Sequence, residues 1–237
     1  RKRNNDNMSS PEHVAIIMDG NGRGGLKKRN SRNYGHKQGL KVVEEIISES
    51  IKKKIKFLTL FVFSTENWKR PSNEINYLFK LLDRYIDKEI KNLIEKGIKV
   101  KVIGNIKKFP KSLKSKIYKV QKITKLNKKI QVNMALNYGS KHEIINACKQ
   151  IIKNKIPLNQ TNIEKNLYTK GMPEPEILIR TGNTNRISNF LIWQSIYTEI
   201  FFVKKMWPDF NKNDFKKIIS NFKKIDRNFG GLNVRIN

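Results

Sequence analysis

Short, continuously apolar runs alternate with longer amphipathic segments along most of this chain. Several runs are apolar at consecutive positions, which is typical of parallel strands that helices cover on both faces. The runs are Val14–Met18, Leu58–Phe63, Ile98–Ile103, Ile130–Leu136, Glu176–Ile179 and Glu199–Val203. Alternation of this kind predicts the α/β class, with a mostly parallel sheet flanked by helices.

The segments between these runs have helical spacing. One apolar stripe comprises Leu40, Val43, Ile47 and Ile51. A longer stripe begins after Pro71-Ser72, with Glu74 in the first turn, where a carboxylate complements the helix dipole. Gly97 is expected to end that helix, because glycine readily adopts the left-handed conformation that follows a helix.

The length of 237 residues suits one α/β domain, and no internal repeat is present. Lys153–Thr161 is the only linker-like stretch, and it is too short to separate domains. We therefore expect a polar, disordered start over 1–12, one domain over 13–231, and a short tail over 232–237.

The charge is strongly positive, with 50 basic and 20 acidic residues giving +30. Such an excess fits a polyanion such as nucleic acid. However, 39 of the basic residues are Lys, Ile and Asn are abundant, and the lysines spread along nearly every helix, as an AT-rich genome would produce. Composition therefore disfavours nucleic-acid binding, while the positive field still favours phosphorylated substrates and anionic membrane surfaces.

Cysteine content and hydropathy restrict the class of protein further. Cys148 is the only cysteine, which excludes an internal disulfide and a multi-cysteine metal site, and it is expected in the core. No apolar run reaches the roughly 18–20 residues of a membrane span, and no secretory signal is seen. A cytoplasmic protein is expected, with contact to a membrane surface allowed and organelle import left open.

The residues directly after the strands are the most polar and the richest in Gly and Arg. In open parallel sheets ligands bind at the carboxyl ends of the strands, so these junctions should hold the chemistry. They are Asp19–Arg23, Ser64–Arg70, Asn137–Gly139 and Arg180–Gly182.

The first junction combines a carboxylate, two glycines and an arginine. Glycines let backbone N–H groups approach a phosphate, and Arg23 could grip it with two hydrogen bonds. A carboxylate there makes sense mainly if Mg²⁺ lies between Asp19 and the phosphate. A plain strand-to-helix turn, with Asp19 as the cap, is the alternative.

Arginine placement points to the same regions. Only 11 residues are Arg, and five of them lie near the junctions: Arg23, Arg32, Arg70, Arg180 and Arg186. In a chain whose surface charge is nearly all Lys, Arg indicates sites that need a planar fork for phosphate. Two diphosphate substrates would account for five such residues; helix-surface ion pairs are the alternative, and they suit Arg84 better.

Two further residues have two interpretations each, and a third, His36, has one. Trp68 either contacts a substrate with a polar head and an apolar tail or simply packs. Glu199 is either a second metal carboxylate or a charge at a strand end. His36 is close enough to Arg32 to contact the same anion. No Ser-His-Asp order and no histidine-rich metal cluster is present.

The motifs together resemble the cis-prenyltransferase family, also called the undecaprenyl diphosphate synthase family. The likeness runs in order from about His13 to Gly231. The segments that carry it are His13–Arg23, Gly35–Gly39, Leu58–Pro71, Leu136–Gly139, Ile177–Gly182, Arg186–Leu191, Trp207–Phe210 and Arg227–Gly231.

The resemblance implies a homodimer with a six-stranded parallel sheet and a hydrophobic tunnel. It implies an Mg²⁺-dependent enzyme that condenses isopentenyl diphosphate onto an allylic diphosphate, farnesyl diphosphate, to give a long-chain polyprenyl diphosphate, a precursor of cell-wall lipid carriers. Asp19 and Asn67 would be catalytic, and Asp19 and Glu199 would bind the metal. Substrate would be bound by Gly20, Asn21, Gly22, Arg23, Gly24, Arg32 and His36, by Ser64, Thr65, Glu66, Trp68 and Arg70, and by Arg180, Arg186, Ile187 and Ser188.

Three positions depart from the family pattern. Gly24-Gly25-Leu26 stands where Trp-Ala-Lys is usual, Asn183-Thr184-Asn185 replaces Gly-Glu-x, and Asn228 replaces a common Arg. These departures leave open a weakly active or non-catalytic partner subunit, although such subunits usually lose the Asp and Arg that are present here. Medium-sized residues at Val62 and Ile130, where the tunnel floor is expected, favour a long product.

Overall fold

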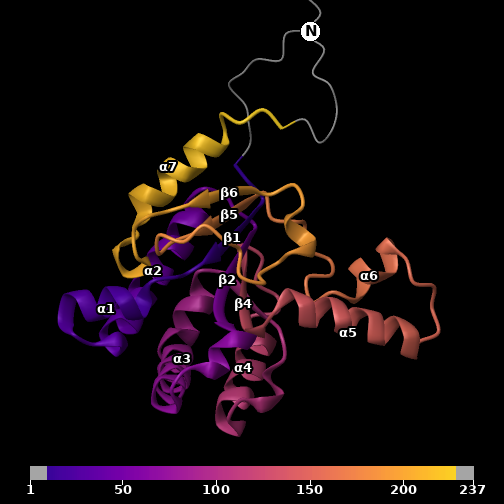
Figure 1. Ribbon diagram of the computed structural model, residues 1–237, viewed down its shortest axis with the longest axis horizontal. Helices are drawn as coiled ribbons and strands as arrows, with labels where there is room; N and C mark the ends of the chain where they lie inside the picture. The colour runs from indigo at the N-terminus through magenta and orange to yellow at the C-terminus, as the bar shows by residue number, and fades with distance from the viewer. Residues whose placement is uncertain (1–9, 228–237) are drawn as a thin grey trace, which may run out of the picture.

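The structure is a computed structural model that describes residues 10–227 (Figure 1). Six strands form one sheet in the order β3-β4-β2-β1-β5-β6, and every pairing is parallel. The strands are β1 (His13–Ile17), β2 (Phe57–Ser64), β3 (Ile98–Ile103), β4 (Ile130–Tyr138), β5 (Ile177–Arg180) and β6 (Glu199–Phe202). The predicted six-stranded α/β domain is confirmed.

Two of the helices contain the apolar stripes expected from the sequence. The helices are α1 (Asn21–Arg29), α2 (Arg32–Lys52), α3 (Ser72–Glu95), α4 (Lys111–Ile123), α5 (Ser140–Lys153), α6 (Gln160–Asn166) and α7 (Lys212–Phe222), with a 3₁₀ turn at Thr65–Lys69. The hydroxyl of Ser31 accepts a hydrogen bond from the Tyr34 amide and so caps α2. Gly97 follows α3 with φ +65°, as predicted.

Apolar side chains cover both faces of the sheet. The larger core packs residues of α2, α3, α4 and α7 against one face. The smaller core on the other face includes Tyr138, Phe190 and Leu191, which are fully buried. Cys148, expected in a core, is only half-buried, because the buried face of α5 is taken by Glu143, Ala147 and Ile151.

Strand β1 lies between β2 and β5, so the chain moves to one side of β1 first and returns on its other side. This arrangement creates a switch point at the carboxyl ends of β1, β2 and β5, where open sheets bind their ligands.

Some expectations fall on residues outside 10–227. The start of the expected N-terminal segment, the tail over 232–237 and Asn228 lie there, and the domain boundaries stay predictions. Within the described residues, no helix combines the length and the apolar character needed to cross a bilayer.

Candidate active site

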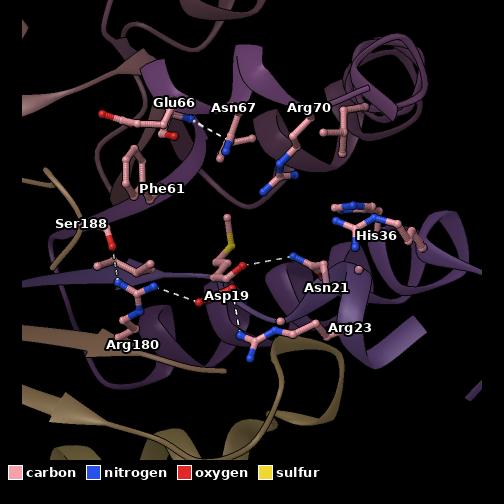
Figure 2. A pocket seen from close by; sticks show the side chains of 18 of the residues that line it. Asp19, Asn21, Arg23, His36, Phe61, Glu66, Asn67, Arg70, Arg180 and Ser188 are labelled. Carbon is pink, nitrogen blue, oxygen red and sulfur yellow. Dashed lines mark hydrogen bonds and ion pairs between the residues drawn. The ribbon is translucent and has the colours of Figure 1, made fainter. Parts of the chain in front are cut away.

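A cavity of about 570 Å³ opens at the switch point (Figure 2). It gathers most of the residues singled out in the sequence, from the ends of three strands and the starts of three helices. The predicted residues that line it are Asp19, Gly20, Asn21, Gly22, Arg23, Arg32, His36, Ser64, Glu66, Asn67, Arg70, Arg180, Arg186 and Ser188.

Asp19 lies between two arginines at the floor of this cavity (Figure 2). Its Oδ2 is 2.9 Å from Nη2 of Arg180, and its Oδ1 is 3.3 Å from Nη2 of Arg23. Arg23 also donates a hydrogen bond to the Gly182 carbonyl at 2.7 Å. Two guanidinium groups around one carboxylate leave an excess of positive charge, which favours an anion beside Asp19.

Arg180 is held from two further sides. Its Nη1 donates to Ser188 Oγ at 2.6 Å and also to the carbonyl of Arg186. The side chain is only 5% exposed, so neighbouring atoms fix the orientation of the guanidinium. The loop at Arg186–Ser188 is thereby attached to the end of β5.

A second cluster of cations shares one carboxylate, that of Glu74 on α3. Arg32 contacts it through Nε at 2.9 Å and Nη2 at 3.1 Å, and Arg70 through Nη1 at 3.1 Å. His36 Nε2 lies 3.3 Å from Glu74 Oε1. Glu74 is 7% exposed, and its contacts hold three predicted phosphate ligands together.

Protonation states in this cluster follow from burial and charge. Burial would raise the pKa of Glu74, but the hydrogen bond from Arg32 and the charges of Arg70 and Arg32 outweigh it and lower that pKa. Burial lowers the pKa of His36 below its usual value in spite of Glu74. Near pH 7 we therefore expect a neutral His36 that donates its Nε2 proton to the Glu74 carboxylate.

Glycines let the loop after β1 pack closely. Gly20 has φ +99°, and a Cβ there would lie 2.6 Å from Met206 Sδ. A Cβ on Gly22 would lie 2.6 Å from Arg32 Cζ. Both positions need glycine, the first for its backbone conformation and the second because the Arg32 guanidinium lies against the chain.

Asn67, predicted as the proton acceptor, is already engaged. Its Oδ1 accepts a hydrogen bond from the Ser64 amide at 3.0 Å, within a reciprocal cap of the 3₁₀ turn. The second lone pair of Oδ1 and the NH₂ group remain for a ligand in the cavity. The cap of this turn accounts for the position of Asn67, and its catalytic role stays a prediction.

Four predicted substrate residues do not line this cavity. Gly24 is inside α1 and faces Met206 and Pro208. Thr65 faces Gly139, and Ile187 packs against the smaller core. Trp68 packs edge-on against Phe63 and Phe79 and donates to Asn137 Oδ1 at 2.9 Å, so the packing interpretation describes its position.

Glu199, predicted as a second metal ligand, lies at the other end of the sheet from Asp19. It opens β6 and pairs with Ile177, which pairs with Val14 near the start of β1. Asp19 follows the end of β1, so the strand rise alone separates the two levels by about 10 Å or more. One chain therefore does not bring these two carboxylates to one ion.

The site nevertheless fits Mg²⁺ in one mode. No group of three His, Cys, Asp or Glu side chains within residues 10–227 could hold a metal by itself. Mg²⁺ is commonly bound through one or two carboxylates together with substrate phosphates and water. Asp19, half-buried and facing the cavity, matches that mode as a single protein ligand beside a phosphate.

Apolar residues form one wall, among them Val62, which the family resemblance placed at the tunnel floor. A smaller cavity of about 90 Å³ lies between α2, α3 and β2 and shares Met18, Val62 and Leu78 with the larger one. A cationic mouth that leads into an apolar slot suits a ligand with an anionic head and an apolar tail. The roles of Glu74 and Leu78 were hard to foresee, because helix periodicity accounted for both residues without reference to a site.

Comparison with known proteins agrees with this chemistry. The family model for undecaprenyl diphosphate synthase matches residues 17–230. Isoprenyl transferases of Clostridium perfringens and Prochlorococcus marinus subsp. pastoris are 42% and 43% identical, over 94% and 97% of this chain and 90% of theirs. A probable undecaprenyl diphosphate synthase from Campylobacter jejuni has a TM-score of 0.81 at 36% identity, covering 94% of this chain and all of that one. Lavandulyl diphosphate synthase from Lavandula x intermedia, in complex with dimethylallyl diphosphate, has a TM-score of 0.89 at 28% identity, covering 93% and 98%.

Proposed function

The chain belongs to the undecaprenyl diphosphate synthase family and is a prenyltransferase, and we propose that it condenses isopentenyl diphosphate onto farnesyl diphosphate in an Mg²⁺-dependent reaction. The product would be a long-chain polyprenyl diphosphate, the precursor of a cell-wall lipid carrier. The observation that carries the proposal is the position of Asp19 between Arg180 and Arg23, in a cavity that adjoins an apolar slot.

The allylic diphosphate would bind beside Asp19, against Gly20–Arg23, Arg32 and His36. Amides at the start of α1 and the guanidinium of Arg32 suit its phosphate oxygens. Its tail would enter the slot past Met18, Val62 and Leu78, and elongation requires the slot to widen into the expected tunnel between α2 and α3. The structural relative from Lavandula, in complex with an allylic diphosphate, supports this class of substrate.

Isopentenyl diphosphate would bind at Arg180, Arg186 and Ser188. The Arg186 side chain is exposed and forms no ion pair with any residue that the structure describes, so it is available for a phosphate. Ser188 is fixed by Arg180, which also contacts Asp19. This arrangement would hold the two diphosphates on opposite sides of one carboxylate.

In the reaction, the allylic C–O bond breaks and the electron pair leaves with the diphosphate. The isopentenyl double bond supplies the electrons of the new C–C bond, and loss of a proton forms the new double bond. Bound Mg²⁺ would neutralise charge on the departing diphosphate. Arg23 and Arg32 would stabilise the same charge, and, with Asn67 Oδ1 engaged, the proton would pass to diphosphate or water.

Assembly and location stay predictions. A homodimer is supported by apolar side chains exposed on and before the edge strand β6, including Ile196, Ile200 and Phe202. A metal role for Glu199 would require Asp19 from a second copy, because its own Asp19 lies at the far end of the sheet. A cytoplasmic location in contact with anionic membranes is likewise proposed from composition.

The test is incubation with labelled isopentenyl diphosphate, Mg²⁺ and geranyl, farnesyl or geranylgeranyl diphosphate, with product length resolved. We expect the fastest incorporation with farnesyl diphosphate and products extended by many units. A folded protein that adds one unit only would contradict the long-chain product, and one that adds none would contradict the reaction.

A further inference from the structure

The positive charge is concentrated in one part of the chain. Residues 96–142 contain no acidic residue and no arginine, although lysines occur along nearly every helix. Their lysines are Lys96, Lys99, Lys101, Lys107, Lys108, Lys111, Lys114, Lys116, Lys119, Lys122, Lys125, Lys128, Lys129 and Lys141. Helix α4 lies at the centre of this block.

The two faces of α4 differ in character. Leu113, Ile117 and Val120 are buried in the larger core. On the outer face Tyr118 is 58% exposed and Leu126, just beyond the helix, is 83% exposed. Tyr118 and Lys122 are four residues apart and lie on one face of the helix, which forms a line that continues toward Leu126 in the turn after it.

The exposed lysines beside this line form no ion pairs with the residues that the structure describes. Lys116, nearer the core, contacts Asp83 and Asp87 of α3 at 2.6 and 2.5 Å, which uses the acidic groups of the neighbouring helix. Among residues 10–227, none forms an ion pair with the exposed lysines of the outer face, which are Lys111, Lys119, Lys122 and Lys125. This face, called the α4 surface below, therefore carries unbalanced positive charge around exposed apolar side chains.

We propose that the α4 surface docks onto an anionic lipid bilayer. Its lysines would contact lipid phosphates, while Tyr118 and Leu126 would enter the interface between headgroups and acyl chains. The apolar pair favours lipid over nucleic acid, since duplex phosphates offer no apolar environment for an aliphatic side chain. The complete lack of arginine also argues against a base-reading surface.

This proposal goes beyond the transfer reaction and does not depend on it. Phe109, directly before α4, lines the apolar slot together with residues of α3, so docking would bring the slot wall close to lipid. Figure 1 shows α3 and α4 projecting away from α7, which makes α7 a suitable control position.

The test measures binding of the full chain to sedimented vesicles of phosphatidylcholine, with or without phosphatidylglycerol. We expect binding only to the anionic vesicles. The triple variant Lys119→Gln/Lys122→Gln/Lys125→Gln should lower the partition coefficient about 100-fold, since each lysine near such a surface contributes about fivefold. The matched variant Lys217→Gln/Lys223→Gln/Lys224→Gln loses the same charge at α7 and should change binding less than about twofold.

Substitution of the two apolar residues separates the contribution of their insertion into the bilayer from that of the lysine charges. Tyr118→Ser/Leu126→Ser should weaken the binding that remains in high salt, where lysine contributions are screened. Circular dichroism checks that every variant folds. Equal losses in both triple variants, or no binding to anionic vesicles, would overturn the proposal. Tighter binding of duplex DNA than of vesicles, lost in the α4 variant, would assign the surface to nucleic acid instead.

Discussion

The carboxylate of Asp19 accepts a hydrogen bond from Nη2 of Arg180 at 2.9 Å, although 161 positions separate the two residues. The contact joins the loop after β1 to the end of β5, across the switch point of the sheet. Because Arg180 also holds Ser188, one buried guanidinium sets the position of the carboxylate and of the neighbouring loop.

Arg180→Lys should therefore impair substrate binding although the charge is kept. An ammonium group cannot reach Asp19, Ser188 and the Arg186 carbonyl at once, because it lacks the planar fork. We expect the KM for isopentenyl diphosphate to rise about tenfold or more, equivalent to about 1.4 kcal/mol. Steady-state kinetics check this value, with Arg84→Lys on the exposed side of α3 as the control. Equal KM values for the two variants would contradict the role of Arg180.

Glu74→Gln should disturb the allylic diphosphate rather than isopentenyl diphosphate. Loss of the charge removes the shared partner of Arg32 and Arg70, at a cost of about 2 kcal/mol in unfolding free energy. The KM for farnesyl diphosphate should rise while the KM for isopentenyl diphosphate changes little. Glu95→Gln, exposed at the end of the same helix, should leave both values and the stability unchanged. A uniform fall in kcat with neither KM altered would rule out this assignment.

His13 predicts how stability depends on pH. Burial lowers its pKa to about 4, although its Nδ1 donates to the Pro173 carbonyl at 2.7 Å. The unfolded chain, with a pKa near 6.5, then binds more protons than the folded chain at intermediate pH. The stabilisation is complete above about pH 6.5 and is lost as pH falls toward 4, which amounts to about 2 kcal/mol by pH 5.

Urea unfolding at pH 7.5 and 5.0 isolates this effect. The wild type should lose about 2 kcal/mol more than His13→Gln over this interval. His142→Gln, on the exposed side of α5, should behave as the wild type does. If His13→Gln loses as much stability as the wild type, His13 is not the group that titrates.

The adjacent glycines Gly24 and Gly25 in α1 should respond differently to substitution by alanine. A Cβ on Gly25 would lie 2.3 Å from the Ser31 carbonyl and 2.5 Å from the Gly35 amide, so the backbone would have to move. On Gly24 the nearest atom, Met206 Cβ, would be 3.3 Å away. Gly25→Ala should cost about 1–3 kcal/mol, whereas Gly24→Ala should be near neutral because helix propensity offsets the tight contact. Thermal unfolding that shifts equally in both variants would contradict this packing.

The sequence predicted the strands within a few residues because their apolar runs report burial on both faces, as at Val14–Ile17. It predicted the strand ends as the site because a parallel sheet brings its carboxyl ends to one edge. It did not predict the Glu74 cluster, since Arg32 and Glu74 lie 42 positions apart on different helices. It did not predict that Glu199 and Asp19 of one chain lie at opposite ends of the sheet, because the register of strand pairing cannot be read from an apolar run.

Trp68 shows a further limit of sequence reasoning. An aromatic after a strand end suits either substrate or packing, and only the positions of Phe63 and Phe79 place this one in the core. The α4 surface was not predicted, because lysine is abundant throughout the chain and does not mark this region. The feature that marks it is the absence of acidic residues over 96–142.

The most direct test of the central claim compares Asp19→Asn with the wild type in the transfer of labelled isopentenyl units to farnesyl diphosphate with Mg²⁺. The substitution keeps the shape of the side chain but removes the charge that lies between Arg23 and Arg180. We predict rapid incorporation by the wild type and a loss on the order of 1,000-fold in the variant, with folding intact by circular dichroism. Undiminished incorporation by Asp19→Asn, or none by the folded wild type, would contradict the account.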